Sequence, residues 1–243
     1  MQSSKEKEKK LFTTRDIFTG GYWREAALQL KDVRVLCVAA MLIALRIALK
    51  GTKIPVGQDL NITFGFFVNS LGAMIFGPVM AVIGAVISDT LGVLVDPSGG
   101  AYFFPFVFVE VAGSLIFALM LWRQKLTSTR IILSRFFVVA ACNYVLNPAI
   151  LNWYYLILNN GKSSKFITLP RVIKNLALFP AEAFLLILFL SAMVLPLTKL
   201  GLIPSGQEKL TFTKKNAVLL AVLFILSAVF VGMYYFVYLP NKH

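Results

Sequence analysis

Gly72-Ala73-Met74-Ile75-Phe76-Gly77-Pro78 is the centre of the stretch that decides the fold. It lies between Leu60-Asn61-Ile62-Thr63-Phe64 and Asp96-Pro97-Ser98-Gly99-Gly100-Ala101-Tyr102-Phe103-Phe104-Pro105. Two apolar runs meet at Gly77-Pro78, each about as long as a membrane span requires. Glycine relaxes the backbone and proline is tolerated in the first turn of a helix, so the dipeptide predicts a tight reversal between two helices. The stretch therefore predicts a membrane hairpin with a recognition loop at its far mouth.

Composition places the whole chain in a membrane. Of the 243 residues, 58% are hydrophobic and only 14% are charged, and the mean hydropathy is +0.77. Soluble proteins carry roughly 25% charged residues. The formal net charge of +13 comes from basic residues that flank the apolar runs, a distribution that the positive-inside rule explains without nucleic acid. Cys37 and Cys142 lie inside apolar runs, without metal-ligand spacing, and indicate no metal site.

The apolar runs predict an all-α membrane protein with seven spans. We expect them at about Val33–Leu49, Ile62–Phe76, Val79–Val95, Tyr102–Trp122, Ile131–Leu158 (interrupted at Asn147-Pro148), Arg171–Leu197 and Asn216–Leu239. Residues 50–61 are expected to form a polar loop. Three regions follow: a cytoplasmic tail at 1–30, a six-span bundle at 31–198, and a loop with the seventh span at 199–243. Within the tail, the aromatic and basic residues of 17–30 suit an interfacial helix, either a passive anchor or a partner-binding element.

The distribution of lysine and arginine predicts the orientation. With a cytoplasmic N-terminus, 16 of the 24 basic residues lie on the inner side, five on the outer side and three within spans. The inner set includes a basic loop between the fourth and fifth spans, marked by Arg123, Lys125, Arg130 and Arg135. An odd number of spans then puts the C-terminus outside. Arg46 lies near the outer end of the first span, where we expect its side chain to snorkel toward the headgroups.

The outward-facing ends of the spans carry the candidate site residues. Tyr102, Phe103 and Phe104 follow a glycine-rich turn and could sandwich a planar ligand, while Trp153 lies in a second aromatic run. An aromatic belt at the membrane surface is the alternative for these residues.

Charged residues within the spans are the other candidates. Arg171 and Lys174 share a helix face and suit an anionic group on the ligand, with snorkelling as the alternative. Asp89 and Glu110 lie within spans, where a carboxylate requires a partner or a wet cavity. We include Glu110 among the predicted substrate-binding residues.

Ala40, Ala44 and Ala48 recur every four residues along the first span. The spacing places three small side chains on one helix face, where a neighbouring helix can approach closely in lipid. The face is a candidate surface for docking a partner helix.

Several of these motifs together resemble one family of membrane proteins. They are Leu60-Asn61-Ile62-Thr63-Phe64, the Gly72 to Pro78 turn, Gly84 with Asp89, Pro97-Ser98-Gly99 leading to Tyr102-Phe103-Phe104-Pro105, and Arg171-Val172-Ile173-Lys174 before Pro180. Over about Leu30 to Leu197 the chain is similar to the substrate-binding S components of energy-coupling-factor (ECF) vitamin transporters, and within them to the folate family. Pro105 is followed by Phe106, Val107 and Phe108, where that family usually has Gly-Phe-Thr.

The resemblance implies a function as well as a fold. It implies a six-helix bundle, extended here by a seventh span, that binds a vitamin outside and releases it inside. Folate or a related pterin compound is the expected substrate; pantothenate, a pyrimidine or another vitamin precursor is the alternative. The small-residue face of Ala40, Ala44 and Ala48 would dock on a transmembrane coupling subunit. Two partner ATPases would hydrolyse ATP, since the chain has no Walker A motif and needs no cofactor of its own.

Two other classes of protein remain open from the sequence. An intramembrane enzyme could use Asp89, Glu110 or Glu182, although the one histidine, His243, lies outside every predicted span and no two carboxylates share a short motif. A purely structural membrane scaffold is the second. Binding of a small ligand without turnover would distinguish the S-component interpretation from both.

Overall fold

The computed structural model describes residues 11–50, 52–57, 60–95, 102–158, 169–207 and 214–233. The chain begins with a short 3₁₀ turn, η1 (Thr14–Phe18), followed by α1 (Gly20–Leu28), a second turn, η2 (Gln29–Lys31), and α2 (Val33–Ala48). Asp32 caps α2, because its carboxylate accepts hydrogen bonds from the backbone amides of Arg34 (3.0 Å) and Val35 (3.5 Å). The helix predicted at about Val33–Leu49 is therefore present as α2, with nearly the predicted bounds.

A β-hairpin follows α2, in a region that we expected to be a polar loop and the start of a span. Strands β1 (Lys53–Gly57) and β2 (Leu60–Thr63) pair antiparallel, with Lys53 opposite Thr63 and an irregularity between Pro55 and Gly57. The prediction of an all-α protein is correct for the bundle and wrong for this hairpin. Alternation of apolar and polar residues at Leu60-Asn61-Ile62-Thr63 is the strand signal that the longer apolar run obscured.

Helix α3 (Gly65–Val95) contains the predicted reversal. Gly77 interrupts the helical backbone with φ 78° and ψ 179°. Two contacts from α2 show that the chain folds back there: Arg46 bonds Asn69 before the turn, and Lys50, one helical turn from Arg46, bonds Asp89 after it. The two halves of α3 therefore run side by side in opposite directions, as Gly77-Pro78 predicted.

The next apolar rods are α4 and the α5–α6 helix. A 3₁₀ turn, η4 (Phe104–Phe106), leads into α4 (Val107–Leu121). Helices α5 (Ser128–Val138) and α6 (Asn147–Leu158) are joined by a π-helical segment, η5 (Val139–Leu146), so the expected break at Asn147-Pro148 is absent. The wider π turns lie immediately before Pro148, which cannot donate a backbone hydrogen bond.

Helices α7 (Leu169–Lys199) and α8 (Lys214–Met233) complete the described chain, and α8 packs mainly on α7. Four helices in the described ranges are long and apolar enough to cross a membrane, at Gly65–Val93, Phe104–Leu121, Ser128–Ile157 and Arg171–Lys199; Ala217–Met233 is a shorter apolar helix. The protein is thus a multi-pass membrane protein with an apolar C-terminal helix added to its bundle.

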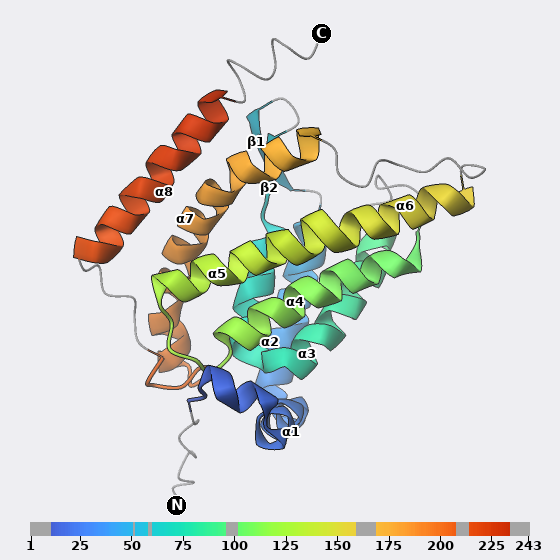
Figure 1. The fold of residues 1–243 in the computed structure, drawn as a ribbon. Helices are drawn as coiled ribbons and strands as arrows, with labels where there is room; N and C mark the ends of the chain where they lie inside the picture. Colours follow the sequence, from blue (N-terminus) through green and yellow to red (C-terminus); the bar gives the residue numbers. More distant parts are fainter. Residues whose placement is uncertain are drawn as a thin grey trace, which may run out of the picture.

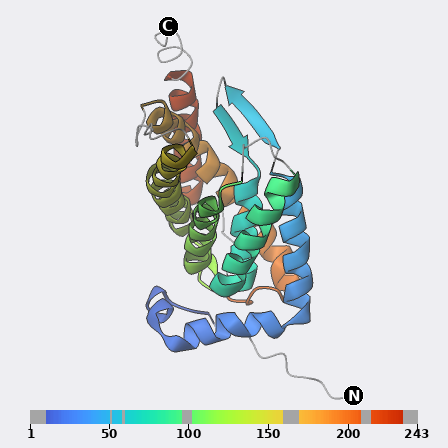
Figure 2. The same cartoon turned by 90° about the vertical axis from the view of Figure 1, so that its right-hand side faces the viewer.

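The β-hairpin and α1 lie far apart in the molecule (Figure 1). The β-hairpin lies at one end, and α1 lies across the other, as the rotated view shows (Figure 2). At the α1 end the Phe12 amide donates to the Arg123 carbonyl (2.7 Å), and the Gln207 side chain donates to the Leu121 carbonyl (2.8 Å). The main apolar core runs between these ends and draws residues from α2, α3, α4, α5, α7 and α8.

Candidate functional site

A cavity of about 400 Å³ opens between the helices in the half of the bundle nearest the β-hairpin. Its walls come from α2 and the two halves of α3, and from α4, α5, η5 and α7, and the last residue of β2, Thr63, also contributes. This size lies within the range of small-molecule pockets. The lining is unusually polar for a membrane interior: Arg46, Lys50, Thr63, Asn69, Ser88, Asp89, Glu110, Arg135, Asn143, Lys174, Asn175 and Glu182.

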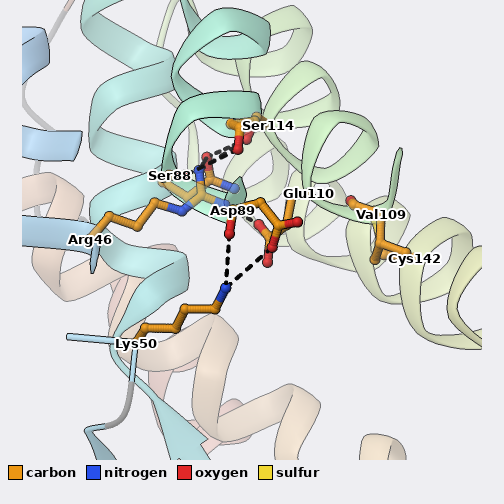
Figure 3. A network of polar contacts seen from close by, with 10 residues as sticks. Arg46, Lys50, Ser88, Asp89, Val109, Glu110, Ser114 and Cys142 are labelled. Atoms are coloured by element: carbon orange, nitrogen blue, oxygen red, sulfur yellow. Dashed lines mark hydrogen bonds and ion pairs between the residues drawn. The ribbon is translucent and has the colours of Figure 1, made fainter. Parts of the chain in front are cut away.

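Arg46 joins three elements on one wall of the cavity (Figure 3). Its guanidinium forms an ion pair with Glu110 on α4 and donates to Asn69 (3.3 Å) and Ser114 (3.4 Å), while the Ser114 hydroxyl donates to the same Asn69 oxygen (2.7 Å). The expectation that Arg46 snorkels to the headgroups is wrong. The helical repeat that places Arg46 beside α3 and α4 faces it toward an acid, and a paired charge is cheaper to bury than a single one.

Lys50 supplies the partner that Asp89 was expected to require. Its ammonium lies 3.2 Å from the Asp89 carboxylate and 3.5 Å from the Asp89 backbone oxygen (Figure 3). The Asp89 side chain is buried, whereas a third of the Lys50 side chain remains exposed. The pair therefore fixes the end of α2 against the second half of α3 and leaves a cation at the edge of the cavity.

An ion pair between Arg135 and Glu182 forms the floor of the cavity. The two side chains are about nine-tenths buried, and the Arg135 Nε and Nη2 atoms lie 3.0 and 2.6 Å from one Glu182 oxygen. The Arg135 guanidinium also lies over the Phe66 ring, 4.5 Å from its centroid. Arg135 was interpreted as part of a basic cytoplasmic loop, and this is wrong: it lies two turns inside α5, which begins at Ser128.

Helix α7 contributes a cationic side chain to the cavity that takes part in none of these ion pairs. Within the described ranges, Lys174 lines the cavity with no ion pair or hydrogen bond, and its neighbour Asn175 accepts from Asn143 (2.6 Å). The Asn175 amide also donates to the Arg171 carbonyl (2.9 Å). One guanidinium nitrogen of Arg171 is buried without a hydrogen-bond partner, one helical turn from Lys174.

The predicted aromatic residues lie beyond the residues that line this cavity. Phe103 packs edge-on against Trp153 (5.6 Å between ring centroids) and Tyr154 (5.4 Å), while Tyr102 and Phe104 are about half exposed. All of them lie where α4 begins and α6 ends. The structure thus brings Glu110 and Lys174 of the predicted set into the cavity and gathers Phe103 and Trp153 in a separate cluster.

The alanine face of α2 is open. Ala40, Ala44 and Ala48 are all exposed in the described part of the chain, as are the neighbouring Met41 and Leu45. The opposite face of α2 carries buried Val35 and Ala39 and packs on α3. The small-residue face is therefore uncovered in the structure, and its docking role remains a prediction.

The charge balance of the cavity limits what can bind there. Four cationic side chains line it (Arg46, Lys50, Arg135 and Lys174) against three acids (Asp89, Glu110 and Glu182). Three ion pairs engage all three acids, and Lys174 is the cationic side chain of the described lining that has no ion pair. An anionic group on a ligand would neutralise it, while the amides and carboxylates offer hydrogen bonds to a polar ring. No group of metal-ligating residues occurs in the described ranges.

Charged walls enclosed by membrane-spanning helices define a membrane protein that binds a polar small molecule. Residues 34–188 match the family described as the ECF transporter, substrate-specific component. The chain belongs to this family and is a substrate-binding transporter component, not an enzyme. Members of this class bind substrate and work with a coupling module.

The relatives that match are folate transporters. The folate transporter FolT of Clostridium novyi (strain NT) is 28% identical over 157 residues, which cover 65% of this chain and 88% of the relative. FolT of Leuconostoc mesenteroides subsp. mesenteroides is 32% identical over 154 residues, which cover 62% of this chain and 81% of the relative. A crystal structure of FolT bound with folic acid superposes with a TM-score of 0.53 at 28% identity, covering 62% of this chain and 88% of that one.

Sequence reasoning missed most of the cavity's polar residues. Asn69, Asn143 and Asn175 lie within apolar runs, and a polar amide at membrane depth is itself a signal for an interior position. Arg135 carried the same signal, since it falls inside the fifth predicted span. What the sequence could not supply was the pairing, because Arg46 and Glu110 are 64 residues apart.

Proposed function

We propose that this chain captures folate or a related pterin compound on the outer side of the membrane and delivers it inward when coupled to partner ATPases. The observation that carries the proposal is the cavity with one unpaired cation, Lys174, in a chain whose relatives are named folate transporters. Folates combine a flat polar ring with a carboxylate tail. The tail matches Lys174 and the buried, unpaired nitrogen of Arg171.

The ring would occupy the opposite part of the cavity. Glu110 offers carboxylate acceptors there and Asn69 offers its amide N–H groups as donors, and both side chains are held in place by Arg46. Tyr102, Phe103 and Phe104 precede Glu110 by about two helical turns and, with Trp153, would cover the mouth above the ring. This retains the predicted aromatic contacts as part of the proposal.

Ligand titration of purified protein tests the substrate. We expect folic acid to bind the wild type, and Lys174→Met or Arg171→Ala to weaken it at least about tenfold, because a buried charge-assisted contact typically contributes about 2–5 kcal/mol. Binding of pterin, which carries the ring without the tail, should change little in either variant. Lys199→Met removes an exposed lysine at the other end of α7 and serves as the control.

Three outcomes would count against the folate assignment. Equal weakening of folic acid and pterin would make the cations structural. Binding of pantothenate or a pyrimidine precursor in place of folic acid would shift the substrate to the alternative that Phe106 and Val107 suggest. If no vitamin binds, the result would favour a purely structural membrane scaffold.

The proposed orientation puts the α1 end in the cytoplasm and the β-hairpin end outside. Lysine and arginine gather at the α1 end, which the positive-inside rule assigns to the cytoplasm. The proposed topology has seven crossings: α2, the two halves of α3, α4, α5–α6, α7 and α8. An impermeant thiol reagent added to intact cells should label a cysteine at Tyr102 and not one at Lys125; the reverse pattern would overturn the orientation.

Docking on the coupling subunit is proposed to use the exposed face of Ala40, Ala44 and Ala48. Bulky side chains would separate the helix backbones, so Ala44→Trp should abolish co-purification with that subunit while ligand affinity stays the same. Leu226→Trp, at an exposed position of the added helix α8, is the matched control. Unchanged co-purification of Ala44→Trp would move the docking surface elsewhere.

A further inference from the structure

The segment from Phe12 to Lys31 lies across the end of the bundle rather than along it (Figures 1 and 2). Its inner side is buried: Tyr22 and Ala26 are fully covered and pack around Trp122 at the end of α4. Phe12 and Tyr22 meet the Trp122 ring at 5.5 and 5.0 Å. Because the long helices define the membrane normal, the segment lies parallel to the membrane surface.

The outer side of the same segment exposes large apolar groups. Phe18 is 90% exposed, Leu28 48% and Trp23 40%. The Trp23 Nε1 donates to the Ile17 carbonyl (2.9 Å), so its polar atom is satisfied within the segment and the ring itself needs no water. Rings and a leucine on the outside of a surface-parallel helix suit the boundary between headgroups and acyl chains.

The acids of the segment are all engaged by the protein. Asp16 accepts from the Thr13 amide (2.7 Å), Glu25 forms an ion pair with Arg123, and Asp32, immediately after the segment, caps α2. Burial lowers the pKa of Arg123 from its ordinary value even though Glu25 acts in the opposite direction. Both acids of the segment are thus engaged by protein groups, Asp16 within the segment and Glu25 at the end of α4.

The bases of the segment differ from its acids in having no such partners in the described part of the chain. Arg15, Arg24 and Lys31 are exposed, and no ion pair or hydrogen bond of theirs occurs within the described part of the chain. The exposed surface is therefore cationic and apolar at once. That combination complements a bilayer surface with anionic headgroups, which attracts nearby basic residues.

We propose that residues 12–31 form a binding surface for anionic phospholipid, with Phe18, Trp23 and Leu28 between the lipids and Arg15, Arg24 and Lys31 on the headgroups. An acidic protein surface would match the three bases but would leave Phe18 almost wholly exposed without reason. The surface is independent of the ligand cavity and of which side of the membrane the segment occupies.

Quenching by brominated lipid tests the proposal in the full chain reconstituted in vesicles. A fluorescent nitrobenzoxadiazole label is placed at Phe18→Cys in a Cys37→Ser, Cys142→Ala background. The vesicles contain acyl-brominated phosphatidylcholine alone or with about 30% phosphatidylglycerol, an anionic lipid. We expect quenching at position 18 in both, and about twofold more with phosphatidylglycerol. A label at Ser205→Cys, exposed at the same end of the molecule, should stay unquenched.

Charge variants separate a specific surface from net charge. Arg15→Gln, Arg24→Gln and Lys31→Gln together should abolish the gain from phosphatidylglycerol. Lys125→Gln, Lys199→Gln and Lys215→Gln remove as many exposed charges elsewhere and should preserve it. Equal signals at positions 18 and 205, or no effect of phosphatidylglycerol, would overturn the proposal. If the label at position 18 is shielded from water only after the coupling subunit is added, the surface would be assigned to a protein partner instead of lipid.

Discussion

The two ends of the helix bundle are built from the same helices, but one end encloses a polar cavity and the other is closely packed. Near the β-hairpin, α3 and α4 contribute charged side chains to the lining of a cavity, with Asp89 and Glu110 each paired to a cation at the end of α2. At the α1 end the same two helices close on buried rings, Tyr22 and Trp122. The difference shows that the cavity end keeps polar groups in fixed pairs around open space, while the other end is closed by packed rings.

The largest effect is expected when the Arg135–Glu182 ion pair at the floor of the cavity is broken. Removing one partner of a buried ion pair leaves the other charge unpaired, so Glu182→Ala should destabilise the protein by about 3–5 kcal/mol. Thermal unfolding in detergent measures the loss. Replacing both partners, as Arg135→Met with Glu182→Leu, should recover most of the stability and still abolish any ligand contact with the floor. An unchanged midpoint in Glu182→Ala would mean that water already screens the pair.

The closed end should be nearly as sensitive at one glycine. A Cβ added at Gly77 would lie 2.6 Å from Trp122, and φ is +78° there, so Gly77→Ala combines a clash with backbone strain. We expect a loss of about 2–4 kcal/mol, read from the same unfolding curves. Gly232→Ala on α8, where no atom lies within 4 Å, should be neutral or stabilising. Similar behaviour of the two variants would contradict tight packing at this end.

The smallest effect refines the comparison at Tyr22, whose hydroxyl is buried without a hydrogen-bond partner. Tyr22→Phe removes an unsatisfied polar atom, so it should leave stability unchanged or raise it by about 1–2 kcal/mol. Burial raises the pKa of the Tyr22 hydroxyl above its ordinary value of 10, so the folded state favours the neutral form. Stability should therefore be complete below pH 10 and fall as the pH rises through the higher folded-state pKa.

The measurement for Tyr22 is a comparison of alkaline unfolding profiles. Wild type should lose stability above about pH 10, and Tyr22→Phe should lose less over the same range. Tyr102→Phe, at an exposed position, is the control and should retain the wild-type slope. Identical slopes for all three proteins would show that the Tyr22 hydroxyl reaches water.

The sequence predicted those parts of the fold whose signals are local. Gly77-Pro78 predicted the reversal inside α3 because a positive φ and a missing backbone donor are properties of those two residues. The alternating Leu60 to Thr63 strand was hidden inside a longer apolar run. The π-helical segment before Pro148 could not be predicted, because a proline signals the loss of a hydrogen bond but not how the helix accommodates it.

The cavity was harder to predict than the fold, since its contacts link distant helices. Lys174 and Glu110 were predicted as site residues and line the cavity. Arg46 and Arg135 were assigned to the membrane surface and to a loop, because an arginine near the end of a span usually snorkels. Only the folded structure, which brings α2 to α4 and α5 to α7, shows that each faces an acid.

The ion pair under the cavity has a consequence for the energy supply of the cell. A hydrated pocket reaching into a membrane thins the barrier that sustains the ion gradients, and each charge crossing it dissipates about 2.3 kcal/mol per 100 mV. Arg135 and Glu182 line the pocket together with Phe117, a fully buried ring, and neutralise each other there, so a proton that enters the pocket meets no unpaired carboxylate among its described lining residues. We therefore expect the ion pair that shapes the pocket also to limit proton leakage across the membrane when no substrate is being transported.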